Sequence, residues 1–475
     1  MPSQCNRRTF LKSLGAAALV LPVCGNAFAL EPAAKKRPNV LFLFADDQRF
    51  STLHALNNPD IQTPNLDRLA RNGVAFTHAH IMGSMSGAVC MPSRAMLMSG
   101  RTLFHLEKDG QTIPPEHEIL PETFRKAGYT TFGTGKWHNS PAAYARGFTH
   151  GGNIFFGGMW NHLEVPVFDF DPEGKYPKEK RHIGGKFSSE LFSDTAIEFI
   201  ETCPNDTPFF LYVAYMAPHD PRMAPKEYAD LYPPEKVALP PNFLPEHPFD
   251  NGELHIRDEE LAKFPRTPEI VREHLAAYYA MITHLDAHIG RVLDALEASG
   301  RADDTIVVFA ADNGLAVGQH GLLGKQNLYD HSARVPLIIG GPGLPKGETR
   351  DGLCYLLDVY PSLCELAGLD IPASVDGKSL APMLRDPKAA GRESVHLAYR
   401  DFQRGVRQGD YKLIEYAVNG QRTTQLFNIE ADPWELTNLA NDPAHAETVT
   451  RLRTELRRWR NEFGDPSPFW DTVPG

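Results

Sequence analysis

Four short apolar runs along the chain predict β-strands that are buried on both faces. Within each run the apolar residues are nearly continuous and do not alternate with polar ones, which is typical of strands in the middle of a parallel sheet. The runs are residues 40–45, 209–215, 305–311 and 335–339.

Helical patterns lie between these runs. Residues 65–70 open one helix behind Pro64, and apolar residues recur near a 3.6 period through residues 269–298, just before Gly300. Strands that alternate with helices indicate an α/β fold, in which a large and mostly parallel sheet is flanked by helices.

Three of the apolar runs are followed by residues of types that can bind a metal ion or transfer protons. Asp46 and Asp47 follow the first run, His219 follows the second, and Asp312 and Asn313 follow the third. Ligands of open α/β sheets bind beyond the carboxyl ends of the strands. The pattern therefore predicts one functional edge of the sheet.

The chain changes character after residue 386. We predict a catalytic domain over residues 30–386 and a smaller α+β domain over residues 387–475. Two long irregular segments interrupt the first, over residues 140–186 and 221–268, and loops of this length are more often functional than idle. The expected C-terminal elements are antiparallel strands at residues 394–398, 411–416 and 424–428, and a helix at residues 447–462.

The first 29 residues have the pattern of a twin-arginine export signal. Arg7 and Arg8 precede an apolar stretch over residues 16–23, and Ala27-Phe28-Ala29 supplies a cleavage site. A membrane anchor is the alternative, but the stretch is too short to span a bilayer, and no other stretch is long enough. We expect a mature protein in the bacterial periplasm or outside the cell.

Charge narrows the possible partners. The whole chain carries a net charge of -11, and loss of residues 1–29 removes three cations and no acid, which brings it to -14. An acidic protein is a poor candidate for nucleic-acid binding. It also repels anions at long range, so any anionic substrate must be held by a local group of cations.

Cys90 stands in the sharpest motif of the chain, Cys90-Met91-Pro92-Ser93-Arg94. A buried free cysteine in a turn is the plain alternative for such a short motif. The segment that follows, residues 94–101, resembles the second half of the sulfatase signature, in which a helix runs from a modified cysteine to a glycine-arginine turn. The chain thus resembles the type I, formylglycine-dependent sulfatases of the alkaline phosphatase superfamily.

The resemblance extends over nearly all of the mature chain and favours bacterial polysaccharide-degrading members. The other short motifs occur in the order of the family. They are Arg37-Pro38-Asn39-Val40, Thr63-Pro64-Asn65-Leu66-Asp67, Gly135-Lys136-Trp137-His138, Asp312-Asn313-Gly314, Gly324-Lys325 and residues 432–439.

Asp46, Asp47, Asp312 and Asn313 offer only oxygen ligands, a set that suits Ca²⁺ or Mg²⁺ better than zinc. Solvated loop acids are the alternative for any one pair. The resemblance implies Ca²⁺ at this place, with Mg²⁺ less favoured, and the modified Cys90 side chain as a further ligand.

The resemblance also assigns roles to single residues. It implies that a formylglycine-generating or radical-type maturing enzyme oxidises Cys90, and that Arg94 orients the product. Lys136 and Lys325 would bind sulfate oxygens. Asp312 would accept a proton during attack on sulfur, His219, with Lys325, would protonate the leaving alcohol, and His138 would take the proton whose loss releases sulfate.

The substrate expected from export and from the long loops is a sulfated carbohydrate, or another small sulfate ester. Candidate sugar contacts in the long loops are Trp160, His162, His182 and Arg222. His320 is either a contact near Lys325 or an ordinary loop histidine.

Three alternatives remain open at this point. The first is a phosphodiester or phosphonate monoester hydrolase of the same superfamily, although cysteine replaces the usual nucleophile and zinc-binding histidines are missing. The second is a binding protein that kept the fold without the activity, which the full set of expected site residues argues against. The third is a choline or aryl sulfatase.

Overall fold

The computed structural model describes residues 37–471, all of which belong to one compact unit. The predicted export signal, residues 1–29, lies outside the described residues. Within residues 37–471, none of the helices has the length and apolar character needed to cross a membrane.

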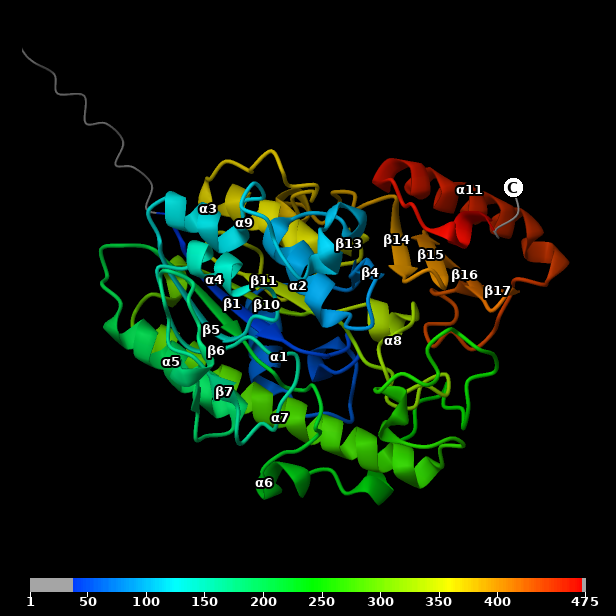
Figure 1. Cartoon of the computed structure of the whole chain (residues 1–475), viewed down its shortest axis with the longest axis horizontal. Coiled ribbons are helices and arrows are strands. Elements are labelled where there is room, and N and C mark those ends of the chain that lie inside the picture. Colours follow the sequence, from blue (N-terminus) through cyan, green and yellow to red (C-terminus); the bar gives the residue numbers. More distant parts are fainter. Residues whose placement is uncertain (1–36, 472–475) are drawn as a thin grey trace, which may run out of the picture. The chain divides into compact units, whose positions relative to one another are not determined.

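The main sheet has eight strands in the order β12-β2-β11-β10-β1-β9-β5-β6 (Figure 1). Strand β11 is antiparallel to both of its neighbours, and the other pairs are parallel. This confirms the α/β prediction. The strands are β1 (Asn39–Ala45), β2 (Val74–Phe76), β5 (Thr130–Lys136), β6 (His150–Phe155), β9 (Phe209–Ala214), β10 (Thr305–Ala311), β11 (Leu337–Gly340) and β12 (Glu348–Arg350).

The four apolar runs are strands β1, β9, β10 and β11. Strand β1 is buried along its whole length between β10 and β9, with Leu41 beside both Val307 and Leu211. The last run starts at Leu337 instead of Val335, because Pro336 has no N–H to donate to a ladder.

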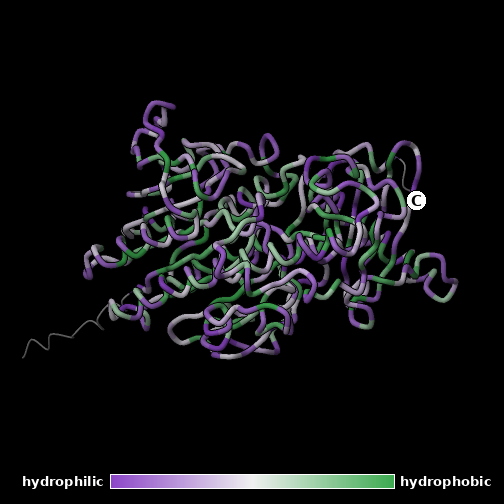
Figure 2. Tube along the Cα trace, turned by 90° about the horizontal axis from the view of Figure 1, so that it is seen from below, coloured by the Kyte–Doolittle hydropathy of each residue, from purple (hydrophilic) through white to green (hydrophobic). Residues whose placement is uncertain are grey.

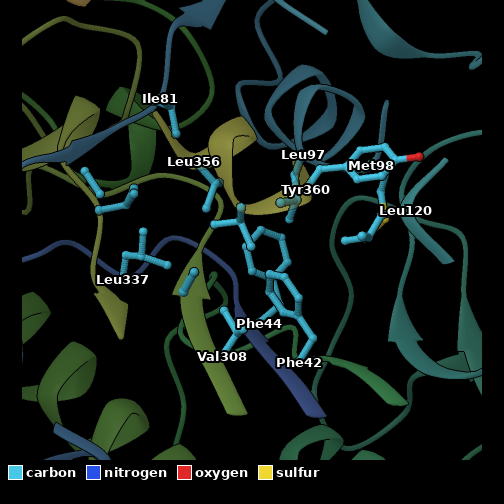
Figure 3. Packing of buried hydrophobic residues seen from close by; sticks show 14 of the residues in the cluster. Phe42, Phe44, Ile81, Leu97, Met98, Leu120, Val308, Leu337, Leu356 and Tyr360 are labelled. Atoms are coloured by element: carbon cyan, nitrogen blue, oxygen red, sulfur yellow. The ribbon is translucent and has the colours of Figure 1, made fainter. Parts of the chain in front are cut away.

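Helices cover both faces of the main sheet. Phe42 and Phe44 of β1 point to one face and Leu41 and Leu43 to the other, as the two-residue period of a strand requires. The first face packs against α2 (Cys90–Ser99), α3 (Leu120–Lys126), α4 (Pro141–Gly147) and α9 (Val359–Ala367), and Figure 3 shows part of this core. The second packs against α1 (Pro64–Asn72), α5 (Ser188–Thr202) and α7 (Pro268–Ala298).

The predicted helices are present. Helix α7 extends over the range expected from the 3.6 period, and the Thr267 side chain caps it by accepting a hydrogen bond from the Ile270 N–H. Hydrophobic stretches, green in Figure 2, run mainly through the interior, and hydrophilic ones lie in outer loops and helix ends.

A second sheet lies in the C-terminal region, in the order β17-β16-β15-β14-β4. Its first four strands are antiparallel, as predicted, and α11 packs on it through an apolar stripe that includes Leu452, Leu456 and Trp459. The predicted boundary at residue 386 stays a prediction. The elements are β4 (Gly83–Ser84), β14 (Ser394–Tyr399), β15 (Gln403–Gln408), β16 (Tyr411–Val418), β17 (Gln421–Asn428) and α11 (Ala446–Phe463).

Strand β4 joins this sheet from far away in the sequence. It pairs in parallel with β14, and the Arg400 N–H donates to the Ser84 carbonyl at 2.7 Å. The segment just before Cys90 is therefore fixed by the C-terminal region.

The two long excursions contain little regular structure besides α4 and β6. Short elements, of which β7, β8 and α6 lie in the two excursions, complete the fold. They are β3 (Ala79–His80), β7 (Pro166–Val167), β8 (His182–Ile183), β13 (Cys354–Tyr355), α6 (Lys226–Ala229), α8 (Asp330–Ala333) and α10 (Ala381–Arg385).

Candidate active site

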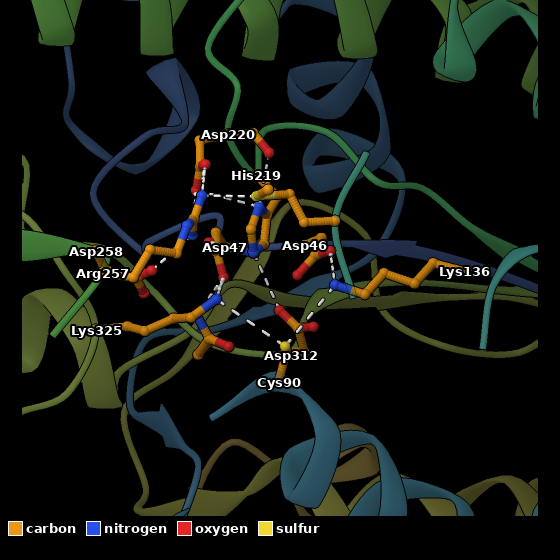
Figure 4. Close-up of polar contacts among 12 residues, drawn as sticks. Asp46, Asp47, Cys90, Lys136, His219, Asp220, Arg257, Asp258, Asp312 and Lys325 are labelled. Atoms are coloured by element: carbon orange, nitrogen blue, oxygen red, sulfur yellow. Dashed lines mark hydrogen bonds and ion pairs between the residues drawn. The ribbon is translucent and has the colours of Figure 1, made fainter. Parts of the chain in front are cut away.

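Four neighbouring strands of the main sheet, β10, β1, β9 and β5, deliver polar residues to one edge (Figure 4). We call the ten residues that meet there the site cluster; nine of them are buried, and His138 is partly buried. All of them were predicted as catalytic or metal-binding residues. They are Asp46 and Asp47 after β1, Asp312 and Asn313 after β10, His219 after β9, Lys136 and His138 at the end of β5, Cys90 and Arg94 on α2, and Lys325.

Cys90 is the first residue of α2, and only 2% of it is exposed. Its Sγ lies 3.2 Å from His138 Nδ1, 3.8 Å from Lys136 Nζ and 4.0 Å from Lys325 Nζ. Burial raises the pKa of the thiol to about 11, against the attraction of the two lysines. The cysteine is thus a neutral thiol at neutral pH, unlike the low-pKa thiolates of cysteine nucleophiles.

A bulge in β5 directs Lys136 into the cluster. The register with β6 shifts between Thr134 and Gly135, and Gly135 has a φ of 89°. A Cβ on Gly135 would lie 1.9 Å from the Ala214 carbonyl oxygen, so only glycine fits here. The glycine before the lysine is therefore a requirement of the site.

The three carboxylates of the site cluster are each matched by one buried cation. Arg94 also donates to the Lys136 carbonyl at 2.9 Å, which ties α2 to β5. Together the six charges cancel, so a bound divalent cation would leave the site positive and ready for an anion. The pairs are Asp46 with Lys136, Asp47 with Lys325 at 2.6 Å, and Asp312 with Arg94 at 2.9 Å.

The cluster has oxygen atoms free for a metal ion. Asp46 Oδ1 and Asn313 Oδ1 are buried and have no hydrogen-bond partner among the described residues. One ligand atom each of Asp46, Cys90 and Asp312 lies within 4.8 Å of the others. Buried carboxylate and amide oxygens without partners are costly unless a ligand takes them up, and they suit Ca²⁺ or Mg²⁺. The residues present therefore fit the predicted metal.

Two histidines flank the centre of the site from different sides. Burial, together with Lys136, lowers the pKa of His138 well below its usual value, so its ring is neutral and can accept a proton. Burial also lowers the pKa of His219, and Asp47 opposes this, with its Oδ2 at 3.6 Å from His219 Nε2.

Behind His219 lies a chain of polar contacts that the sequence did not suggest. Asp220 contacts His219 Nδ1 through its carboxylate at 3.3 Å and its carbonyl at 2.9 Å, and Arg257 pairs with Asp220. Arg257 also pairs with Asp258 at 2.7 Å.

The same chain leads on to Lys325. Gln326 Nε2–H donates to Asp258 Oδ2 at 2.8 Å, and the Lys325 N–H donates to Gln326 Oε1 at 3.0 Å. Asp220 directly follows a predicted site residue and could have been suspected. Arg257 and Asp258 lie in the irregular segment over residues 221–268, where no pattern marks them.

Of the predicted sugar contacts, His162 supports the site from within. It is 0% exposed, its Nε2–H donates to the His219 carbonyl at 3.0 Å, and its Nδ1 accepts from the Ser188 hydroxyl at 2.7 Å. His162 thus holds the backbone of His219 and has no surface left for a sugar.

His320 lies apart from the site cluster. Its ring stacks on Tyr329 at 3.9 Å between ring centres, and its Nε2–H donates to the Glu435 carbonyl at 3.0 Å. These contacts fit the alternative of an ordinary, buried loop histidine.

The remaining three sugar candidates lie in the long excursions. Trp160 is 44% exposed, and His182 lies exposed on the short strand β8. Arg222 lines a cleft next to Asp220. Neither Trp160 nor His182 has a hydrogen bond to the site cluster among the described contacts.

Comparison with known proteins bears on the nature of this site. The family model for sulfatases matches residues 38–369, and a model named N-sulphoglucosamine sulphohydrolase, C-terminal, matches residues 318–462. The protein belongs to the sulfatase family. It is thus a sulfuric ester hydrolase, which confirms the activity inferred from the Cys90 motif.

Several relatives of this sulfatase act on carbohydrates. An ulvan-active sulfatase of Formosa agariphila is 30% identical over 90% of this chain and 82% of its own. An N-acetylglucosamine-6-O-sulfatase of Bacteroides thetaiotaomicron is 26% identical over 95% of this chain and 91% of its own.

Solved structures confirm the fold of this sulfatase. The structure of BT4656 in complex with its substrate D-glucosamine-2-N,6-O-disulfate has a TM-score of 0.77 at 24% identity. The alignment covers 91% of this chain and 99% of the other.

Proposed function

We propose that this sulfatase removes sulfate from a sulfated carbohydrate and that its nucleophile is a formylglycine made from Cys90. The observation that carries the proposal is the position of Cys90. Its Sγ lies at the first turn of α2 between two lysines and a neutral histidine, beside acids with free oxygen atoms. The relatives named above that act on ulvan or on N-acetylglucosamine sulfate support a carbohydrate as the substrate.

Lys136 and Lys325 are the residues proposed to hold the sulfate group. Their ammonium groups lie 3.8 Å and 4.0 Å from Cys90 Sγ, and each pairs with a different aspartate. A sulfate ester whose sulfur is next to residue 90 would place its oxygens within reach of both. Such charges act strongly here, because the site is buried.

Asp46, Asp47, Asp312 and Asn313 would hold the metal ion, which we propose to be Ca²⁺, with Mg²⁺ as the less favoured ion. The ion would supply Lewis-acid polarisation of a sulfate oxygen. Arg94 keeps one oxygen of Asp312 fixed, so the orientation of that carboxylate does not depend on the ion.

Four residues near Cys90 are proposed to transfer protons: Asp312, His138, His219 and Lys325. Asp312, with an oxygen within 4.8 Å of Cys90 Sγ, would accept a proton from the nucleophile. Neutral His138, 3.2 Å from Sγ, would take the proton whose loss frees sulfate. His219 and Lys325 both contact Asp47 and are the donors proposed for the leaving alcohol. A serine in this place would retain sulfate as a stable ester, which is why the oxidised residue, with its second hydroxyl, is needed.

Two measurements test this proposal. Mass spectrometry of the peptide that contains Cys90, from protein made together with a maturing enzyme, should show conversion of the thiol to an aldehyde or its hydrate. Parallel assays with an aryl sulfate, an aryl phosphate and choline sulfate should give the highest rate on a sulfate ester, and a screen of sulfated sugars should exceed them all. Active enzyme with an intact thiol, or a dominant phosphate rate, would refute the proposal.

We further propose that the protein is exported through the twin-arginine route after oxidation of Cys90. This route carries folded proteins, and the thiol is 2% exposed in the folded chain. A maturing enzyme must then act in the cytoplasm before folding. The amino terminus of protein recovered from outside the cytoplasm should begin near residue 30, and a start at residue 1 would contradict the export proposal.

A further inference from the structure

Arg222 is a cation without an anion. The side chain is partly buried, which lowers its pKa, and its Nε is fully buried without a hydrogen-bond partner. None of the acids in the described residues lies within 4 Å of it, and its one hydrogen-bond partner is His274, whose Nδ1 accepts from Nη1 at 2.6 Å. A partly buried charge without a directly paired acid is costly, so such a group points to an anionic ligand.

Arg222 lines a cleft of about 360 Å³, a size at which small ligands are bound. The cleft is bounded by residues from the segment after β9 and from the first turns of α7. Its other lining residues are Asp220, Pro221, Leu261, Glu273, His274 and Ala277.

The cleft adjoins the site cluster. Asp220, which lines it, also contacts His219 Nδ1 at 3.3 Å, and lies beyond His219 in Figure 4. The charge of Arg222 interacts with Asp47 and Asp258 as well as with Asp220. A substrate whose sulfate lies between Lys136 and Lys325 could therefore extend past His219 into this cleft.

Arg222 is not neutralised by the neighbouring acids. Asp220 already pairs with Arg257. Glu273 is exposed, and no ion pair joins it to Arg222. His274 has a pKa lowered to about 4 by burial and by Arg222, so its ring is neutral and serves as an acceptor that orients the guanidinium.

We propose that this cleft binds a second anionic group of the substrate, a carboxylate or a further sulfate on the same or the adjoining sugar, and that Arg222 is the residue that binds it. The proposal rests on the proposed function, because it assumes a sulfated carbohydrate. It narrows the substrate class to polyanionic glycans, and it assigns Glu273 a negative influence on their binding.

The test compares four sulfate esters with parent and variants. They are 4-nitrophenyl sulfate, a sugar with one sulfate, the same sugar with two sulfates, and a disaccharide with one sulfate and one uronate. A charged hydrogen bond in a partly buried site is equivalent to roughly a ten- to a hundredfold change in an equilibrium constant. The parent should prefer an ester with a second anion by this factor in kcat/KM, mainly through KM.

The variants separate charge from structure. Arg222→Met should abolish the preference and leave 4-nitrophenyl sulfate turnover unchanged, and Arg222→Lys should restore part of it. Glu273→Gln should have the opposite effect, because it removes a negative charge from the cleft, and should strengthen the preference for a second anion a few-fold. Arg272→Met, next to Glu273 on α7 but outside the cleft, is the matched control and should keep the parent's preference.

The two substrates with a second anionic group show which anion the cleft binds. A preference limited to the disulfated sugar assigns the cleft to sulfate, and one limited to the uronate disaccharide assigns it to carboxylate. A parent without any preference, or an Arg222→Met variant that retains it, would overturn the inference. A parent without turnover of any sulfate ester would instead contradict the proposed function.

Discussion

His396 should make the folded protein less stable in acid. It lies in β14 and is 0% exposed, with the rings of Phe104 and Phe463 about it. Neither ring nitrogen has a hydrogen-bond partner among the described residues. Burial, with a contribution from Arg404, lowers its pKa from 6.5 to about 3.

The magnitude follows from these two pKa values. The unfolded chain takes up a proton at this histidine near pH 6.5, whereas the folded chain does so only near pH 3. Stability from this residue is therefore complete above pH 6.5 and is lost as the pH falls below it. At pH 5 the loss amounts to about 2 kcal/mol of the free energy of unfolding.

The assay measures unfolding of the parent and of His396→Phe by urea at pH 7 and pH 5. Phenylalanine cannot be protonated and matches the aromatic surroundings, so the variant should gain about 2 kcal/mol over the parent between the two pH values. His182→Phe, which removes an exposed histidine, is the control and should show no such change. An equal acid dependence of His396→Phe and the parent would refute the reasoning.

Three further predictions concern the active site: the role of Lys325, the metal ion and the support of His219 by His162. Lys325→Met should lower kcat/KM for a sulfate ester by roughly a hundred- to a thousandfold, because it removes a cation beside residue 90, whereas the exposed control Lys263→Met should have no effect. Removal of divalent ions with a chelator should abolish activity and lower the unfolding midpoint, and Ca²⁺ should restore both, with a smaller recovery in Asn313→Ala; full activity after chelation would contradict the metal proposal. His162→Phe should lower kcat roughly tenfold with little change in KM, since the His219 carbonyl loses its donor, and His162→Gln should recover part of it.

The middle of the main sheet could be predicted because its strands are buried on both faces. Such strands need nearly unbroken apolar runs, so β1, β9 and β10 stand out in the sequence, and the polar residues just after them stand out as well. A parallel sheet places those strand ends side by side. The position of the site therefore followed from local pattern and topology together.

Strands β5 and β15 could not be predicted in this way. β5 contains three threonines and two glycines, one of which, Gly135, is required by the bulge and the close approach to Ala214. β15 contains Arg404, fully buried only because it pairs with Asp465 in the chain beyond α11. Both depend on partners that are distant in the sequence.

The contacts around His219 depend on tertiary structure even more than strands β5 and β15 do. Arg257 and Asp258 reach the site from an irregular segment whose path is set by its neighbours and by no periodicity. The burial of His162 and His320 likewise reflects where their loops fold back, which gives both histidines structural partners in place of a sugar.

The pairing of β4 with β14 bears on the timing of the proposed oxidation of Cys90. Strand β4 lies a few residues before the cysteine, and its partner is made roughly 300 residues later. At roughly 5–20 residues per second, synthesis takes about 15–60 s to cover that interval. Throughout this time the segment before Cys90 lacks the strand that fixes it in the folded protein. Under the proposed function, a maturing enzyme that needs extended chain would act during translation, before β14 is made and pairs with β4.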